Sequence, residues 1–230
     1  AGNGDLYAAS GFYINQTVYH FYLLRMNADG VVKYIKVSTK FTPVADFQDL
    51  QIVDSSAVIT GVVQHANTYL WELNSKGAQV KNTILQHNGK LIPQRLIRYE
   101  DALYLHAASQ AGNKAYVFKL NNQLQPLWAH QLTLPGVFGL AGNEVLTDGT
   151  GNVLACGTLR AKKHANSLYY SEEDLFLEMF QPQNPGFLWQ YIYSDTGTSY
   201  VTTIRHAVSA DNRITVVTEE KTGPEPEFVV

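Results

Sequence analysis

The sequence predicts an all-β protein, a β-propeller built from four-stranded antiparallel blades. The first observation is a repeat, because Tyr22, Tyr69 and Tyr116 open three similar apolar segments at intervals of 47 residues. A period of roughly 40 to 50 residues is typical of propeller blades. The second observation is the composition, with 14 Tyr and 10 Phe among 230 residues but only 16% charged residues, which favours half-buried strands.

The strand that carries the repeat is apolar on both faces, apart from one charged residue. A strand of this kind is packed between two sheets. We therefore interpret it as a middle strand of a blade, because every blade has a neighbour on each side. Its copies are Tyr22–Asn27, Tyr69–Asn74 and Tyr116–Asn121, with a looser fourth copy at Leu175–Met179.

A turn signal follows this strand. Asn27 and Asn74 each open a tetrapeptide that ends in glycine, at Gly30 and Gly77, and the third copy has Leu124 at this place. Such segments favour a type I turn followed by a left-handed residue. The next strand is more polar and variable, as expected of an outer edge strand. At matching offsets it carries Tyr34, Lys81, Trp128 and Trp189.

Two more strands complete the unit: one that ends in an acid, and a strand of small apolar residues after it. Small residues fit where blades converge towards a central axis. The acids are Asp54, Asp101, Asp148 and Asp211. Because they recur at one place in the repeat, we interpret them as turn residues that bond their own backbone. The alternatives are paired carboxylates of a propeller glycosidase and a calcium loop at residues 148–152.

The strands, labelled A to D in chain order, give B-C-D, then A-B-C-D three times, then A-B. We expect a single propeller domain over residues 1–230, with repeat units of approximately 4–45, 46–92, 93–140, 141–198 and 199–230 and so four to five blades. Closure stays open. The last A strand could complete the first blade, five blades would need strands that the chain lacks, or the chain is part of a larger propeller, which the start inside a blade favours.

The fourth repeat contains an insertion, because the step from Leu120 to Met179 is 59 residues rather than 47. Insertions in repeat proteins lie in loops on one face, often the binding face. Adjacent tyrosines beside charges suit contact with a sugar or a protein, and a solvated variable loop is the alternative. The candidate binding residues are Lys162, Lys163, His164, Tyr169, Tyr170, Glu172, Glu173 and Asp174.

The sequence offers few groups for catalysis. We interpret the single cysteine, Cys156, as a small core residue rather than a nucleophile, because it lies in an apolar run. No phosphate-binding, dinucleotide-binding or nucleophile-elbow motif occurs, so we expect no cofactor. We also expect no metal, since no two histidines have the spacing of a zinc motif, although distant residues could still meet. The histidines are His20, His65, His87, His106, His130, His164 and His206.

Charge and hydropathy exclude two kinds of partner. The net charge is −3 and basic runs are absent, so nothing indicates nucleic-acid binding. No stretch of 18 apolar residues occurs, so we expect no membrane span. The partners that remain are a protein, a glycan or other parts of a larger chain.

The repeats resemble the tandem-repeat β-propeller domains of secreted and surface proteins of bacteria, whose repeats have roughly 50 residues. The resemblance rests on the three Tyr-to-Asn segments, on Ile59-Thr60-Gly61, and on Trp128 and Trp189. It implies a propeller of large extracellular proteins with adhesive or unassigned roles, and it supplies no catalytic residues.

We therefore expect a non-enzymatic module, secreted or at the cell surface, that binds a protein or glycan or takes part in a structural assembly. The alternative is a propeller-type carbohydrate-active enzyme, a glycosidase or lyase, with carboxylates near the central axis. The sequence leaves the identity of the ligand and the oligomeric state undetermined.

Overall fold

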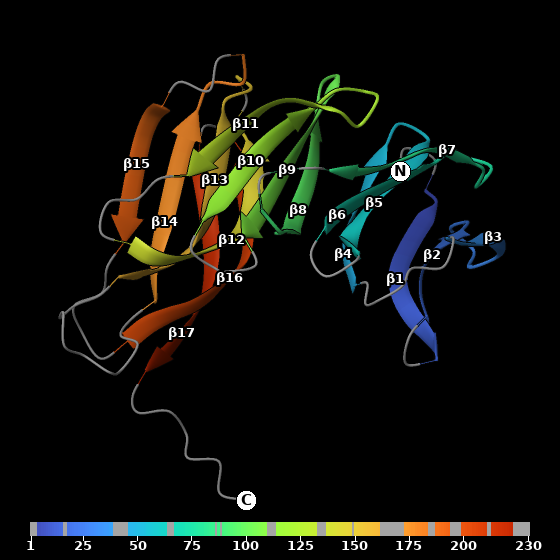
Figure 1. The fold of residues 1–230 in the computed structure, drawn as a ribbon, viewed down its shortest axis with the longest axis horizontal. Helices are drawn as coiled ribbons and strands as arrows, with labels where there is room; N and C mark the ends of the chain where they lie inside the picture. The colour runs from blue at the N-terminus through green and yellow to red at the C-terminus, as the bar shows by residue number, and fades with distance from the viewer. Residues whose placement is uncertain are drawn as a thin grey trace, which may run out of the picture. The chain divides into compact units, whose positions relative to one another are not determined.

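A computed structural model of the chain consists of β-strands joined by turns and connecting segments (Figure 1). It describes residues 4–15, 18–38, 46–63, 67–85, 87, 89–109, 114–132, 137–148, 150–161, 173–183, 187–193, 199–210 and 213–222. These residues contain no helix of the length and apolarity needed to cross a membrane.

The strands form five antiparallel sheets. Sheet one contains β1 (Leu6–Asn15), β2 (Val18–Met26) and β3 (Val32–Val37). Sheet two contains β4 (Asp46–Val53), β5 (Ser56–Val63), β6 (Asn67–Leu73) and β7 (Gln79–Leu85). Sheet three contains β8 (Leu91–Tyr99), β9 (Ala102–Ser109), β10 (Ala115–Leu120) and β11 (Pro126–Leu132). Sheet four contains β12 (Val137–Thr147), β13 (Val153–Ala161), β14 (Glu173–Phe180) and β15 (Phe187–Tyr193), and sheet five contains β16 (Ser199–Ala210) and β17 (Arg213–Thr222).

The fold is all-β, a propeller of four-stranded antiparallel blades, as predicted. Within each sheet the strands are hydrogen-bonded in chain order. Sheet one has the B, C and D strands, the next three sheets have all four strands, and sheet five has the A and B strands. The predicted strand phase is therefore confirmed for the part of the chain that the structure describes.

The chain divides into two compact units, one of residues Ala1–Gln110 and Phe118–Ala129, the other of residues Ala111–Val117 and His130–Val230. In the first unit β4 packs against β1 and β8, and β5 and β6 also pack against β8. In the second unit β16 packs against β12, β13 and β14. The expectation of a single domain with the five repeat units given above stays a prediction.

Four turns of five residues share one hydrogen-bonding pattern. The N–H of the first residue donates to the carbonyl of the fifth, and the N–H of the fourth donates to the carbonyl of the first. The side-chain oxygen of the first residue accepts the N–H groups of the third and fifth residues. This explains why each turn begins with Asn or Asp. The turns are Asn27–Val31, Asn74–Ala78, Asn121–Gln125 and Asp148–Asn152.

The fourth residue of these turns is left-handed, as the turn chemistry predicts. Its φ angle is 80° at Gly30, 73° at Gly77 and 87° at Gly151. In the third turn Leu124 takes this conformation with φ 60°, and its side chain is 1% exposed. A side chain at this position costs about 1–2 kcal/mol relative to glycine, so we infer that burial of the leucine offsets the strain.

The recurring aspartates lie in turns, but not at one common position. Asp54 is the left-handed residue of the β4–β5 turn, with φ 54°, whereas Glu100 takes this place in the β8–β9 turn, with φ 50°. Asp101 is the next residue, because the β8–β9 hairpin closes one residue earlier than the 47-residue offset requires. Asp148 opens a five-residue turn, and Asp211 lies outside the described residues.

A hydrophobic cluster joins sheets one and two. Tyr19, Phe21 and Leu23 of β2 pack against Ile59 of β5 and Trp71 of β6, and all five side chains are buried. The rings of Phe21 and Tyr69 stack with their centroids 6.0 Å apart. One face of sheet one is thus covered by one face of sheet two, as in a stack of blades.

The fourth repeat is aligned one residue away from the sequence-based prediction. In three sheets a register shift between the C and D strands falls after Arg25, Glu72 and Met179, so these residues are equivalent. Glu178 therefore occupies the position of Trp71 and not that of Glu72. The offset arose because the fourth copy was matched by its charged residue, whereas an acid here replaces an aromatic residue of the core.

Candidate docking surfaces

One face of sheet one carries exposed apolar residues in the described structure, and we call it the first-sheet face. Leu6 is 54% exposed, Ile35 60% and Val37 49%, although all are large apolar residues. The strand register places them on one side of the sheet, opposite to the side that packs on sheet two. The described side chains of this face are Leu6, Ala8, Ser10, Phe12, His20, Tyr22, Leu24, Met26, Val32, Ile35 and Val37.

The first-sheet face carries no Asp, Glu, Lys or Arg among those residues, so it is typical of a surface that another apolar layer covers. The equivalent positions of Tyr22 and Leu24 in sheet two are Tyr69 and Trp71, which are buried against sheet one. A sheet that is apolar on both faces has both faces packed. The first-sheet face is thus the counterpart of a buried surface.

The turns at Gly30 and Gly77 also differ in whether a neighbouring strand of the described structure lies against them. A Cβ atom added at Gly77 would lie 2.9 Å from atoms of the Lys36 side chain and 3.0 Å from Tyr34 Cδ2, both on β3. The outer strand of sheet one therefore packs closely on this turn of sheet two. A Cβ atom at the equivalent Gly30 would have no neighbour within 4 Å. Among the described residues no outer strand lies against the turn of sheet one.

A second surface with exposed side chains in the described residues is a row of aromatic residues on β15, which we call the β15 row. It consists of Trp189, Tyr191 and Tyr193, which alternate along the strand and therefore share one face. Their side chains are 37%, 56% and 39% exposed. Trp189 and Tyr191 pair with Met179 and Leu177 across the sheet.

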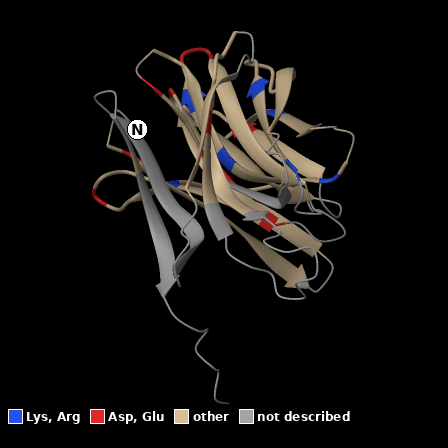
Figure 2. Ribbon diagram, turned by 90° about the vertical axis from the view of Figure 1, so that its left-hand side faces the viewer, with Lys and Arg blue, Asp and Glu red and all other residues tan. Residues whose placement is uncertain are grey.

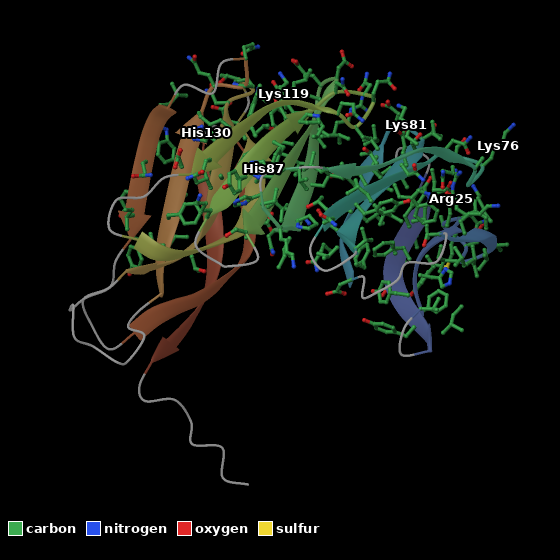
Figure 3. The ribbon with its side chains drawn as sticks, viewed as in Figure 1. Arg25, Lys76, Lys81, His87, Lys119 and His130 are labelled. Carbon is green, nitrogen blue, oxygen red and sulfur yellow. The ribbon has the colours of Figure 1, made fainter. Side chains whose placement is uncertain are left out.

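The β15 row occupies the positions from which other outer strands contact the next sheet. By strand register Trp189 is equivalent to Tyr34 and Lys81, and Tyr191 is equivalent to Lys36. Tyr34 and Lys36 pack on Gly77, and Lys81 Nζ donates to the carbonyl of Asn122 in the turn of sheet three (Figure 3). Sheet five has only its A and B strands in the described residues, so the row has no such turn opposite it.

A buried acid joins β14 to β11. Glu178 Oε1 lies 2.7 Å from Nε2 of His130, and Glu178 Oε2 accepts a hydrogen bond of 3.2 Å from Nε2 of Gln190. The Glu178 side chain is 4% exposed and the His130 side chain 20%. The imidazole also lies on the Phe180 ring, with centroids 4.9 Å apart. This geometry satisfies a buried carboxylate, and we interpret it as structural.

A second ionic cluster ties sheet one to sheet two. Asp5 accepts hydrogen bonds from Lys33 Nζ at 2.8 Å and from Arg25 Nε at 2.7 Å. Arg25 also donates to the carbonyl of Ser75, and its guanidinium lies over the Tyr7 ring. The hydrogen bond from Lys33, together with the charges of both cations, holds the pKa of Asp5 below its usual value. The hydrogen bonds that Asp5 accepts in this cluster come from residues of β2 and β3, so these contacts join strands.

The cysteine and the aspartates for which catalysis was an alternative interpretation have the following surroundings in the described residues. Cys156 is fully buried, and burial raises the pKa of its thiol to about 12, which agrees with a core residue. Asp148 uses both carboxylate oxygens for hydrogen bonds within its own turn, to Thr150 and Asn152. Asp54 forms an exposed ion pair of 2.6 Å with Arg98. The described residues contain no group of three His, Cys, Asp or Glu side chains able to hold a metal ion.

The histidines do not meet in the described structure. His20 Nδ1 lies 2.9 Å from the Ser38 carbonyl, His87 packs edge-on against Phe118, and His106 is fully buried. His65 and His164 lie outside the described residues, as does the side chain of His206. Figure 2 shows Lys and Arg in blue and Asp and Glu in red on both turns and strands of the described residues.

Most of the predicted insertion lies outside the described residues. This holds for Lys162, Lys163, His164, Tyr169, Tyr170 and Glu172. The loop is shorter than predicted, because Glu173 and Asp174 begin β14 and pair with Arg160 and Leu159 of β13. These two acids are therefore strand residues, since β13 extends far enough to pair with them.

Comparison with known proteins supports the fold alone. No family model matches the sequence, and no curated protein matches it. A crystal structure of an ACO/RPE65 chimera with one point substitution has a TM-score of 0.50 at 9% identity, covering 89% of this chain and 50% of that chain. A protein of unknown function from Bacteroides caccae has a TM-score of 0.41 at 8% identity, covering 89% and 81%. An oligogalacturonate lyase in complex with manganese has a TM-score of 0.45 at 13% identity, covering 80% and 49%.

The chain spans about half the length of the chimera and of the lyase. The likeness to the chimera agrees with a propeller fold and, at 9% identity, does not extend to its activity.

Both candidate surfaces were missed by reasoning from the sequence, which directed attention to the insertion. A signal was present, since Trp189, Tyr191 and Tyr193 alternate on a strand expected to be polar. The exposure of the first-sheet face has no such signal, because its residues resemble those of buried strands.

Proposed function

We propose that this chain is a non-enzymatic propeller module that docks protein surfaces through the first-sheet face and the β15 row. The observation that supports it is that Tyr22 and Leu24 are only half-buried, whereas Tyr69 and Trp71 at the equivalent positions are buried between sheets. Apolar faces of this kind mark protein interaction sites more often than they remain in water. The resemblance of the repeats to those of secreted and surface proteins of bacteria supports a module that is secreted or at the cell surface.

The proposal is tested by introducing a charge on the first-sheet face. Ile35→Glu should leave the urea denaturation midpoint within the range of a surface change, about 0.5 kcal/mol in unfolding free energy, because Ile35 is 60% exposed. Leu23→Ala is the comparator on the neighbouring strand, where a fully buried leucine should cost about 2–5 kcal/mol. If Ile35→Glu unfolds the chain as Leu23→Ala does, the face is part of the core and the docking function is wrong.

The absence of catalysis is tested separately. The chain should release no product from a panel of polysaccharides, including pectic ones. Product formation that a single Asp or Glu substitution abolishes would establish the alternative, a carbohydrate-active enzyme.

A glycan is a second candidate ligand, favoured by the composition of the β15 row. Flat aromatic rings with polar tips, spaced about 7 Å apart along a strand, can stack on successive sugar rings. Affinity electrophoresis in gels that contain polysaccharides would show retardation of the chain, lost in Tyr191→Ala and kept in Leu127→Ala, an exposed residue of β11. Equal mobility with and without every polysaccharide would exclude this ligand class.

A further inference from the structure

We propose that the outer edge of β15 binds an extended segment of another protein, which adds to sheet four as a further strand. The proposal rests on the docking function given above and deepens it, because it names the kind of partner that β15 takes. It concerns the hydrogen-bonding edge of the strand, whereas the β15 row is one of its faces.

The edge is open in the described structure. β15 is the last strand of sheet four (Figure 1), and among the described residues no strand pairs with its outer side. Because alternate residues of a strand direct their N–H and C=O groups to opposite sides, an edge strand presents a row of donors and acceptors. Another extended backbone matches such a row over several residues. With seven residues, β15 is long enough to pair with a short peptide.

The outer strands of sheets one to three carry residues that oppose strand addition. β3 contains Lys33 and Lys36, β7 contains Lys81, and β11 begins with Pro126. An added strand would cover part of the hydration of a lysine, and a proline has no N–H group for pairing. β15 contains no Lys, Arg, Asp, Glu or Pro. It is therefore the outer strand of the described sheets that lacks this protection.

The difference concerns equivalent positions of the strands. By strand register, the places of Lys33, Lys81 and Lys36 are occupied in β15 by Leu188, Trp189 and Tyr191. A large uncharged side chain thus replaces each lysine. Segments of six or seven residues with high β propensity, no charge and no proline pair readily with other extended chains.

The inner edge of β15 indicates the side chains that suit its outer edge. There Tyr191 pairs with Leu177 and Trp189 with Met179, both on β14. Cross-strand pairs of aromatic residues with aliphatic or β-branched residues are favourable. β15 also offers no charge to an ionic partner. The partner segment is therefore extended and uncharged, with β-branched and aromatic residues along it.

The experiment titrates the full chain onto a fluorescein-labelled heptapeptide in which valine and tyrosine alternate with threonine, and follows fluorescence anisotropy. The wild type should bind this peptide saturably. The fully N-methylated peptide keeps the side chains but has no backbone donor, so it should bind more than about tenfold more weakly. Equal binding of both peptides would overturn pairing through the backbone.

Hydrogen exchange places the peptide on the chain. A saturating amount of the unmethylated peptide should slow the exchange of outward N–H groups within residues 187–193 more than about tenfold, because these groups become hydrogen-bonded. Docking on the face of the strand alone leaves them exposed to water. Unchanged exchange over residues 187–193 with bound peptide would overturn the proposal.

A lysine variant tests the missing protection. Tyr191→Lys introduces the residue that β3 has at this position, and it should weaken peptide binding about fivefold because it removes an aromatic contact and adds a charge beside the new strand. Thr83→Lys, at the equivalent position of β7, is the matched control and should bind as the wild type does. Equal affinity of Tyr191→Lys and the wild type would overturn the assignment to β15.

Failure of this inference is separable from failure of the docking function. No saturable binding at up to about 1 mM peptide, the weakest affinity of interest, would overturn strand addition. Association of the chain with itself that Tyr191→Lys abolishes would also overturn it, because the added strand would then come from another copy. If Ile35→Glu is folded and as stable as the wild type in either case, the docking function stands; if it is unfolded, the docking function is wrong.

Discussion

His130 Nε2 lies 2.7 Å from Glu178 Oε1, and this pair connects β11 with β14 at a position where sheet two has Trp71. A carboxylate replaces an aromatic residue there, so the site exchanges apolar packing for a hydrogen-bonded charge. Such pairs rarely exceed the stability of a well-packed apolar core, but removing one partner leaves a buried charge.

We expect His130→Ala to lower the free energy of unfolding by about 3 kcal/mol, because Glu178 loses its closest partner in a buried site. Urea denaturation measures the change. The double variant His130→Leu, Glu178→Leu is the control, and it should recover most of the loss by restoring apolar packing. A His130→Ala variant as stable as the wild type would show that the pair contributes little to the fold.

We expect the left-handed position of Leu124 to distinguish alanine from glycine. Both substitutions remove a buried side chain, so both should destabilise the chain. Leu124→Gly should nevertheless be more stable than Leu124→Ala by about 1 kcal/mol, because glycine adopts a φ of 60° without strain. Chemical denaturation of the two variants side by side tests this order. The reverse order would mean that the turn relaxes when the leucine is removed.

We expect the stability provided by Asp148 to decrease in acid. Burial raises the pKa of Asp148, but hydrogen bonds from Asn152 and Thr150 outweigh it and hold the pKa below the ordinary value. A carboxylate whose folded pKa is below its unfolded pKa stabilises the protein above the unfolded value, and this contribution is lost as the pH falls through the folded pKa. The difference in urea midpoint between wild type and Asp148→Asn should therefore shrink between about pH 5 and pH 2. A difference that is constant over this range would contradict the shift.

We expect Cys156 to be unreactive in the folded protein. Its thiol is fully buried and its pKa is raised to about 12, so almost no thiolate forms at neutral pH. A chromogenic disulfide reagent at about pH 8 should label one thiol per chain only after denaturant is added, since unfolding restores a pKa near its ordinary value of about 8.5. Rapid labelling of the native chain would show that the site opens.

The sequence was sufficient for the fold class and for the order of strands, because the signals there are local and repeated. The Asn at the start of each turn and the glycine near its end determine hydrogen bonds that any copy can form alone. The position of Glu178 could not be predicted in this way. Its match to Glu72 preserved charge, whereas its actual neighbour, His130, is 48 residues away and its contact depends on packing.

The candidate surfaces were less predictable for the same reason. Ile35 and Leu23 are both apolar residues of adjacent strands, but Leu23 lies on the middle strand and on the side that sheet two covers, whereas Ile35 lies on the outer strand and on the other side. Whether a side chain is exposed depends on the sheet that packs beside it and cannot be determined from the sequence of its own strand. The insertion attracted attention because an irregular length is visible in a sequence, whereas an uncovered face is not.

The strand phase has a consequence for how such a chain can change in length. Each A strand directly follows the D strand of the preceding sheet, so a duplication or loss of one 47-residue period anywhere in the central repeats adds or removes one whole sheet. The duplicated or deleted segment can begin within a sheet, because a segment of one full period preserves the A-B-C-D order of strands on both sides of the junction. Variation in copy number is therefore available to the gene without any change in the turns or in the contacts between the remaining sheets.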